Sequence, residues 1–115
     1  MTTGAIYISP YNDPVIVAGQ GTMGVELDED LSNIDTVIVA VGGGGLISGI
    51  GGYLKTVQPK VEMVGCSPKN SCVMYESLQA GRILDLPSKP TLSDGTAGGI
   101  EENSITFEIC KKNYK

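Results

Sequence analysis

Short runs of apolar residues alternate along this chain with longer stretches in which apolar residues recur every three or four positions. The runs are typical of buried strands, and the recurring pattern is typical of amphipathic helices. Strands are predicted at residues 5–9, 36–41 and 60–66, and helices at residues 14–31, 47–57, 70–80 and 105–112. Because each strand is followed by a helix, the order predicts right-handed βαβ units and an α/β fold with a parallel sheet.

Local signals place several helix boundaries. Asp13 followed by Pro14 suits the start of the first helix, with Asp as the N-cap and Pro in the first turn. Pro59 ends the second helix and Gly81 ends the third. One face of the first helix is predicted to carry Ile16, Gln20, Met23, Leu27 and Leu31, and the face of the second to carry Ile47, Ile50, Leu54 and Val57.

The run from Thr36 to Val41 is unbroken and mostly β-branched, which favours a strand buried on both faces, as in parallel sheets. A sheet of only three such strands would leave apolar edges unpaired, and unpaired edges promote aggregation. Residues 1–115 are therefore interpreted as one α/β segment, a partial parallel sheet with flanking helices that belongs to a larger sheet.

Composition excludes several classes of function. The net charge of −5 disfavours nucleic-acid binding, and no apolar run is long enough to cross a membrane. The N-terminus has no signal-peptide pattern, and the three cysteines lack a CxxC spacing, which favours reduced thiols in the cytoplasm. Because the chain has no histidine, it lacks both the usual general base and the usual zinc ligand, and no metal site is expected.

Two glycine-rich motifs compete as a ligand site. Residues Gly19 to Gly24 match GxGxxG, which by itself would suggest a dinucleotide-binding turn. However, Asp13 and Pro14 favour a helix here, and the next strand is followed by Gly42 rather than by the acidic residue that would hold a ribose. The preferred interpretation is that these glycines let a helix pack closely against a neighbour.

The second motif, Gly42, Gly43, Gly44 and Gly45 followed by Leu46, lies between the clearest strand and an amphipathic helix. Ligands of open α/β sheets bind at this carboxyl end of the strands. Consecutive glycines allow several backbone N–H groups to converge, and the positive end of the following helix adds to their attraction for an anion. The motif therefore predicts a phosphate site; a merely flexible turn is the alternative. Walker A is excluded because the chain has no Gly-Lys dipeptide.

Four motifs, in their order and spacing, resemble serine racemases and serine/threonine dehydratases, which are fold-type II pyridoxal-phosphate enzymes. They are YISPYNDP at 7–14, AGQGT at 18–22, VGGGGL at 41–46 and SDGT at 93–96. The resemblance extends from about Tyr7 to about Lys112, and AGQGT followed by VGGGGL is its most specific part.

This resemblance implies that the four glycines and Leu46 hold the phosphate of pyridoxal 5'-phosphate through backbone N–H groups, with Gly95 close to the cofactor. It also implies a Schiff-base lysine in a Ser-Phe-Lys-like motif upstream, which this chain lacks, so no catalytic residue is assigned and the chain alone is expected to be inactive. Some members bind a divalent metal through an acid where Ser67 stands here. A polar turn capped by Asn70 or Ser71 is expected there instead.

Two hypotheses of different class stay open. The first is a segment from the larger domain of a dehydratase or racemase, which acts on a small amino acid and forms a homo-oligomer; a dehydratase would convert serine or threonine to a 2-oxo acid and ammonia. The second is a non-catalytic module that binds a phosphorylated small molecule and self-associates through its sheet edges. A nicotinamide-dependent enzyme using Gly19 to Gly24 is a third, less favoured option.

Overall fold

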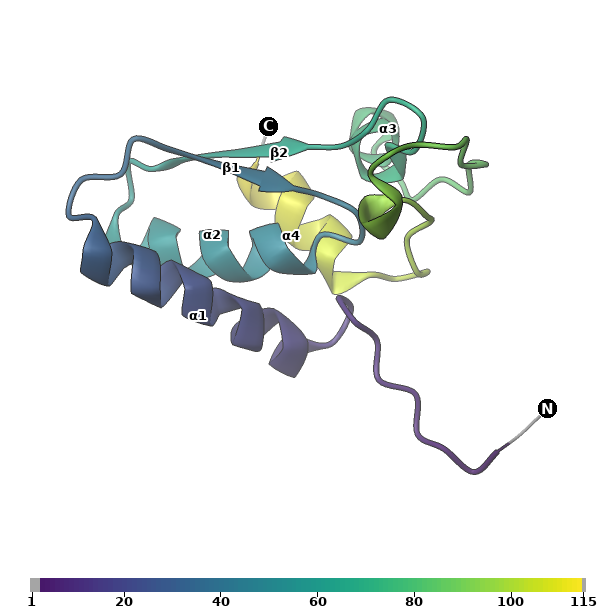
Figure 1. Ribbon diagram of the computed structural model, residues 1–115, viewed down its shortest axis with the longest axis horizontal. Helices are drawn as coiled ribbons and strands as arrows, with labels where there is room; N and C mark the ends of the chain where they lie inside the picture. Colours follow the sequence, from purple (N-terminus) through teal and green to yellow (C-terminus); the bar gives the residue numbers. More distant parts are fainter. Residues whose placement is uncertain (1–2, 115) are drawn as a thin grey trace.

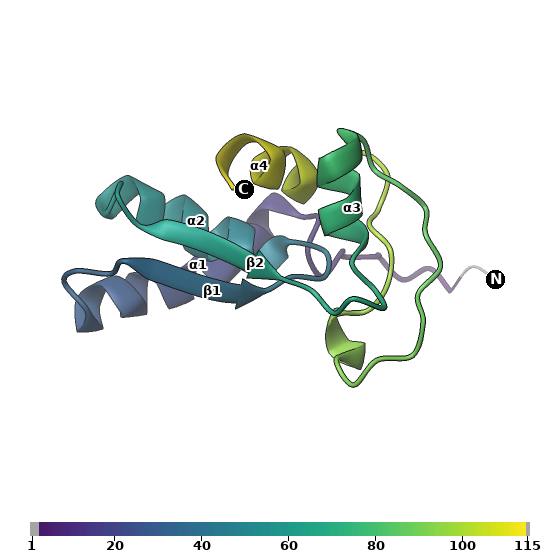
Figure 2. The same ribbon diagram turned by 90° about the horizontal axis from the view of Figure 1, so that it is seen from above.

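A computed structural model describes residues 3–114. Its elements are α1 (Pro14–Asp30), β1 (Thr36–Ala40), α2 (Gly45–Val57), β2 (Glu62–Cys66), α3 (Val73–Ala80), the 3-10 turn η1 (Asp94–Thr96) and α4 (Ile105–Asn113). The two strands lie side by side, α2 runs beneath them, and α1 packs on the side of α2 away from the sheet (Figure 1). Seen from above, α4 lies beside α2, and α3 lies at the end where the strands finish (Figure 2). The predicted α/β class with a partial parallel sheet is confirmed.

The sheet has two parallel strands, paired from Thr36 with Glu62 to Ala40 with Cys66. Its inner face packs on α2, whose predicted core residues are confirmed as buried, except Val57, which is 42% exposed. On the outer face Ile38 is 70% exposed. The expected burial of β1 on both faces is therefore wrong for this chain, because no element among residues 3–114 covers the outer face.

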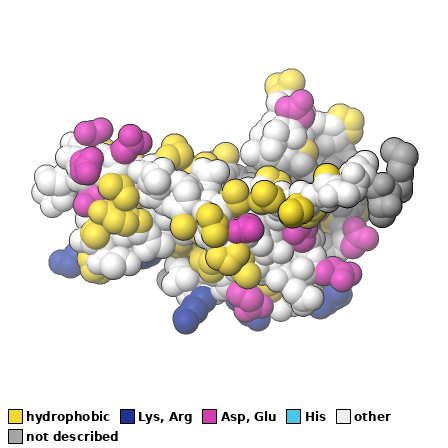
Figure 3. Space-filling view, turned by 90° about the horizontal axis from the view of Figure 1, so that it is seen from below, with side chains coloured by type: hydrophobic (Ala, Val, Ile, Leu, Met, Phe, Trp, Pro, Cys, Tyr) yellow, Lys and Arg dark blue, Asp and Glu magenta, His cyan; other side chains and the backbone are white. Residues whose placement is uncertain are grey.

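The strand predicted at residues 5–9 is also wrong. This segment is extended but unpaired, because a strand needs a partner for its backbone groups and no strand among residues 3–114 runs beside it. Ile6 and Ile8 are 89% and 62% exposed. Figure 3 views the molecule from below. On this face, exposed apolar side chains form a row that leads toward the N-terminal end.

The turn before α3 differs from the prediction as well. The helix begins at Val73 rather than at residue 70, and neither Asn70 nor Ser71 caps it. Instead the Asn70 amide donates to the carbonyl oxygen of Pro90 at 2.7 Å, and the Ser71 hydroxyl bonds that of Ser88 at 2.7 Å. Contacts to a distant loop replace the local cap.

The start of α1 agrees with the prediction. The Asp13 side chain accepts from the N–H of Val15 at 2.8 Å, which is the expected N-cap bond. The predicted apolar face is only partly correct, because Met23 and Leu31 are 46% and 54% exposed. No helix among residues 3–114 is long and apolar enough to cross a membrane.

Glycines form the surface of α1 that meets α2. A Cβ added at Gly21 would lie 3.1 Å from the carbonyl oxygen of Gly49, and one at Gly24 would lie 3.1 Å from that of Ile50. A Cβ at Gly19 would meet nothing within 4 Å. Close helix packing, the preferred interpretation of GxGxxG, is thus confirmed at two of its glycines. A dinucleotide turn is excluded because the motif lies inside a helix.

Candidate functional site

The tetraglycine loop, Gly42 to Gly45, connects the end of β1 to the first turn of α2. Val41, just before it, still donates its N–H to the carbonyl oxygen of Cys66 at 2.8 Å. Gly44 is the N-cap of α2 and has φ 91° and ψ 3°, a left-handed conformation that glycine adopts without strain. This one residue turns the chain from the sheet into the helix.

The backbone N–H groups of residues 42–47 have no hydrogen-bond acceptor among residues 3–114. The first bond of α2 is from the N–H of Ser48 to the carbonyl oxygen of Gly44, at 3.1 Å. Free N–H groups are expected in the first turn of a helix, and they give that end a positive partial charge. Here the glycine loop extends the row of free donors toward β1.

Protein atoms closely surround the tetraglycine loop. A Cβ at Gly42 would lie 2.8 Å from the carbonyl oxygen of Thr96, and one at Gly43 would overlap the Tyr11 ring. At the other two glycines an added Cβ would lie 2.9 Å from the nearest side-chain atom. The loop is therefore fixed by packing, which is not what a merely flexible turn would show.

The surroundings of Gly95, Leu46 and Thr106 differ. Gly95 is in η1, the turn that places Thr96 against Gly42, but a Cβ on Gly95 itself would meet nothing within 4 Å. Leu46 is half-buried and packs against the hydrophobic core. The buried hydroxyl of Thr106, on α4, donates to the carbonyl oxygen of Gly43.

Sequence reasoning did not single out Tyr11, Glu101 or Thr106. The Tyr11 ring lies against the loop, and its hydroxyl accepts from the backbone N–H of Glu101 at 2.7 Å. Tyr11 belongs to the YISPYNDP motif, which was a signal for its importance. The other two lie far along the chain, and no local pattern showed that Thr106 bonds Gly43 or that Glu101 bonds Tyr11.

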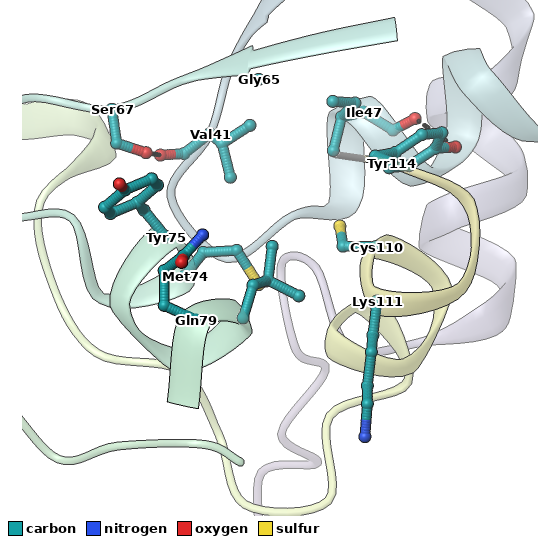
Figure 4. A pocket seen from close by; sticks show the side chains of 11 residues that line it. Val41, Ile47, Gly65, Ser67, Met74, Tyr75, Gln79, Cys110, Lys111 and Tyr114 are labelled. Atoms are coloured by element: carbon teal, nitrogen blue, oxygen red, sulfur yellow. Dashed lines mark hydrogen bonds between the residues drawn. The ribbon is translucent and has the colours of Figure 1, made fainter. Parts of the chain in front are cut away.

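A separate groove of 320 Å³ opens between α3 and α4, on the side of Val41 and Ile47. Figure 4 shows Met74 from α3 and Cys110 from α4 facing this space. Burial raises the pKa of Cys110 to about 11, so its thiol stays protonated at neutral pH. Ser67, where the resemblance would place a metal-binding acid, donates to the carbonyl oxygen of Val41 at 2.8 Å. The groove is thus mainly apolar, and its cysteine is not an activated nucleophile.

Comparisons of the sequence and of the structure with known proteins match the same group of enzymes. A family model described as pyridoxal-phosphate dependent enzyme matches residues 1–115. An L-threonine ammonia-lyase of Thermotoga maritima is 46% identical over 110 residues, which cover 96% of this chain and 27% of that protein. The serine racemase of Arabidopsis thaliana is 41% identical over 109 residues, covering 95% and 32%. The structure of maize serine racemase matches with a TM-score of 0.89 at 35% identity, covering 98% and 35%. The chain spans about a third of the length of these relatives.

Proposed function

We propose, from the premise that this chain belongs to the family of pyridoxal-phosphate dependent enzymes, that residues 42–47 hold the phosphate of the cofactor. The resemblance to fold-type II enzymes of this family is confirmed by the threonine ammonia-lyase and serine racemase matches. The observation that supports the phosphate site is the row of backbone N–H groups without a protein acceptor among the described residues. This row lies at the positive end of α2 and at the carboxyl end of β1.

The donor set fits a phosphate group. Each hydrogen bond to a charged acceptor contributes about 1.5–3 kcal/mol, so a few converging amides can hold a dianion without a basic side chain. Packing by Tyr11 and Thr96 keeps the loop in place before the ligand arrives. Less ordering is then needed on binding, which favours affinity.

The parent activity that we infer is that of a serine or threonine dehydratase or of an amino-acid racemase. The cofactor supplies the electron sink for the amino acid when it is bound. The chain's own part is to hold the phosphate, with Gly43 fixed by the hydroxyl of Thr106 and Leu46 in the first turn of the supporting helix. We propose that this segment of the large domain binds the cofactor phosphate but does not catalyse alone, and that the parent protein is a cytoplasmic homo-oligomer.

Chemical-shift mapping tests the phosphate site directly. The ¹⁵N-labelled chain is titrated with pyridoxal 5'-phosphate, with inorganic phosphate and with pyridoxal, which lacks the phosphate. We expect the amide signals of residues 42–47 to move with the first two ligands and not with pyridoxal. Gly52, exposed in the same helix, provides an internal control. Equal shifts with pyridoxal, or none in the loop, would contradict the proposal.

Borohydride reduction of the dialysed complex tests the absence of catalysis. We expect binding without a stoichiometric adduct at any single lysine, because the chain lacks the Ser-Phe-Lys-like motif. A stoichiometric adduct at one lysine, together with release of a 2-oxo acid from serine or threonine, would show that the chain is active by itself.

A non-catalytic module that self-associates is the second candidate, and the open outer face of the sheet favours it. Ile38 is 70% exposed there, which is unusual for a residue in the middle of an apolar strand. Sedimentation velocity should then show a dimer or larger species that Ile38→Lys dissociates. A wild-type chain that stays monomeric at all concentrations would argue against this candidate.

A further inference from the structure

The carboxylate of Glu101 joins the N-terminal segment to the loop that precedes α4. Its Oε1 accepts hydrogen bonds from the hydroxyls of Tyr7 at 2.7 Å and Ser9 at 2.8 Å. Its Oε2 accepts one from the side-chain amide of Asn12 at 3.0 Å. These donors, the Tyr7 hydroxyl first, lower the pKa of Glu101 below its usual value, so the group is anionic at neutral pH.

The same residue holds Tyr11 at two points. The backbone N–H of Glu101 donates to the Tyr11 hydroxyl at 2.7 Å. At the other end, Ser9 Oγ accepts from the N–H of Tyr11 at 3.4 Å and from the N–H of Asn12 at 2.9 Å, while it donates to the Glu101 carboxylate. Both the ring tip and the backbone of Tyr11 are thereby fixed.

Tyr11 in turn forms a wall against the tetraglycine loop. A Cβ at Gly43 would overlap Cγ of the ring, and a Cβ at Gly45 would lie 2.9 Å from Cβ of Tyr11. Glycine does not restrict its own backbone, so the orientation of these peptide groups depends on what packs against them. The position of Tyr11 therefore helps to decide where the loop amides point.

A second connection runs from Glu101 through Asn12 to α4. Asn12 donates to the Glu101 carboxylate, and its Oδ1 accepts from the N–H of Ile105, the first residue of α4, at 2.7 Å. The next residue, Thr106, donates to the carbonyl oxygen of Gly43. The Glu101 carboxylate is therefore connected to Gly43 in two ways: through Ser9 and Tyr11, and through Asn12 and the start of α4.

We propose that Glu101 is a positioning residue for the phosphate site. It holds Tyr11 and the start of α4 against the tetraglycine loop, and so helps to set the direction in which the free amides of residues 42–47 point. The carboxylate acts on Tyr11 through Ser9, and on α4 through Asn12, without contacting the ligand itself. This inference rests on the proposed function, since it concerns the same amides.

Glu101→Gln tests the inference, with Glu102→Gln as the matched control. Both variants remove one negative charge at adjacent positions, so their long-range effects on an anion should be similar, and Glu102 is exposed. Both carboxylate oxygens of Glu101 accept hydrogen bonds. In Glu101→Gln one of these oxygens is replaced by an NH₂ group, which cannot accept the bond and faces a donor instead. With inorganic phosphate as the probe, we expect Glu101→Gln to raise Kd about tenfold. We expect Glu102→Gln to change Kd by less than about twofold, because an exposed surface charge contributes little.

A readout without ligand separates positioning from the phosphate proposal. In the free protein, Glu101→Gln should shift the amide signals of Gly43 and Gly45, whereas Glu102→Gln should not. Unchanged glycine signals would overturn the inference whether or not phosphate binds. If wild type does not bind phosphate, the proposed function fails. If wild type, Glu101→Gln and Glu102→Gln bind it equally, the proposed function stands and the inference is wrong.

Tyr11→Phe extends the test and covers the case in which Glu101→Gln does not fold. This variant keeps the ring but removes the hydroxyl that accepts from Glu101. We expect weaker phosphate binding in the same direction, and a double variant whose loss is smaller than the sum of the two single losses. Unchanged affinity and unchanged Gly43 signals in folded Tyr11→Phe would overturn the inference.

Discussion

Replacing Gly49 by Ala tests whether backbone contact between α1 and α2 determines the stability of this chain. Gly49 is buried in α2. The added Cβ would overlap the carbonyl oxygen of Val17, and would lie 2.6 Å from the nitrogen of Gly21 and 2.9 Å from the carbonyl carbon of Gln20. All three are backbone atoms of α1, so no side chain can rotate out of the way and the helix itself must move.

Two opposing effects determine the magnitude. Ala is favoured over Gly inside a helix by about 1 kcal/mol. Adding a methyl group to a close-packed contact costs about 1–3 kcal/mol, and more where backbone must shift. Because a whole helix must be displaced here, we expect the upper part of that range, and a net loss of about 1–2 kcal/mol for Gly49→Ala.

Gly52→Ala is the matched control. Gly52 lies in the same helix, is exposed, and has no atom within 4 Å of an added Cβ. It should therefore gain stability by about 0.5–1 kcal/mol from helix propensity alone. Urea unfolding followed by circular dichroism measures both free energies. If Gly49→Ala is as stable as Gly52→Ala, the close contact between α1 and α2 does not exist in solution.

Three further predictions concern other parts of the fold. Gln58→Leu should lower the free energy of unfolding by about 1–3 kcal/mol, because the Gln58 Oε1 that accepts from the N–H of Ile34 at 2.9 Å is lost; urea unfolding that matches wild type would contradict this. The hydroxyl of Tyr7 and the other donors lower the folded-state pKa of Glu101 from its ordinary value of 4.5. The ionised carboxylate therefore stabilises the fold fully above about pH 4.5, and this stabilisation is lost as the pH falls through the folded-state pKa. Urea midpoints measured from about pH 6 down to about pH 3 should therefore fall less steeply for Glu101→Gln than for wild type, and parallel curves would show that the lowered pKa is absent. At about pH 8 a thiol reagent should modify exposed Cys66 well before buried Cys110, whose pKa is about 11; comparable rates in the native state would mean that α4 is not packed as described.

The local elements of this chain follow from its sequence. The Asp13 cap, the αL glycine at position 81 after α3 and the strand that begins at Thr36 depend on interactions within a few residues, and the structure has all three. The tetraglycine loop was also recognisable, because a run of glycines between a strand and a helix is typical of loops whose backbone N–H groups bind an anion.

The predictions that were wrong concern residues whose structure depends on partners distant in the chain. Residues 5–9 have the composition of a strand, but pairing requires a neighbouring strand, which composition cannot supply. Ser71 looked like a helix cap, yet its hydroxyl bonds Ser88. Met23 fits the apolar period of α1, but the neighbouring helix approaches the glycine side instead.

The sequence by itself therefore determined the order of the elements from Pro14 onward and singled out the loop for which we propose anion binding. Only the tertiary structure decided which residues surround that loop, since Tyr11 and Thr106 contact it, and Glu101 bonds Tyr11, from segments separated by more than half of the chain. The physical reason is that backbone preferences and caps act over a few neighbouring residues, whereas close packing and hydrogen bonds between segments exist only after the chain has folded.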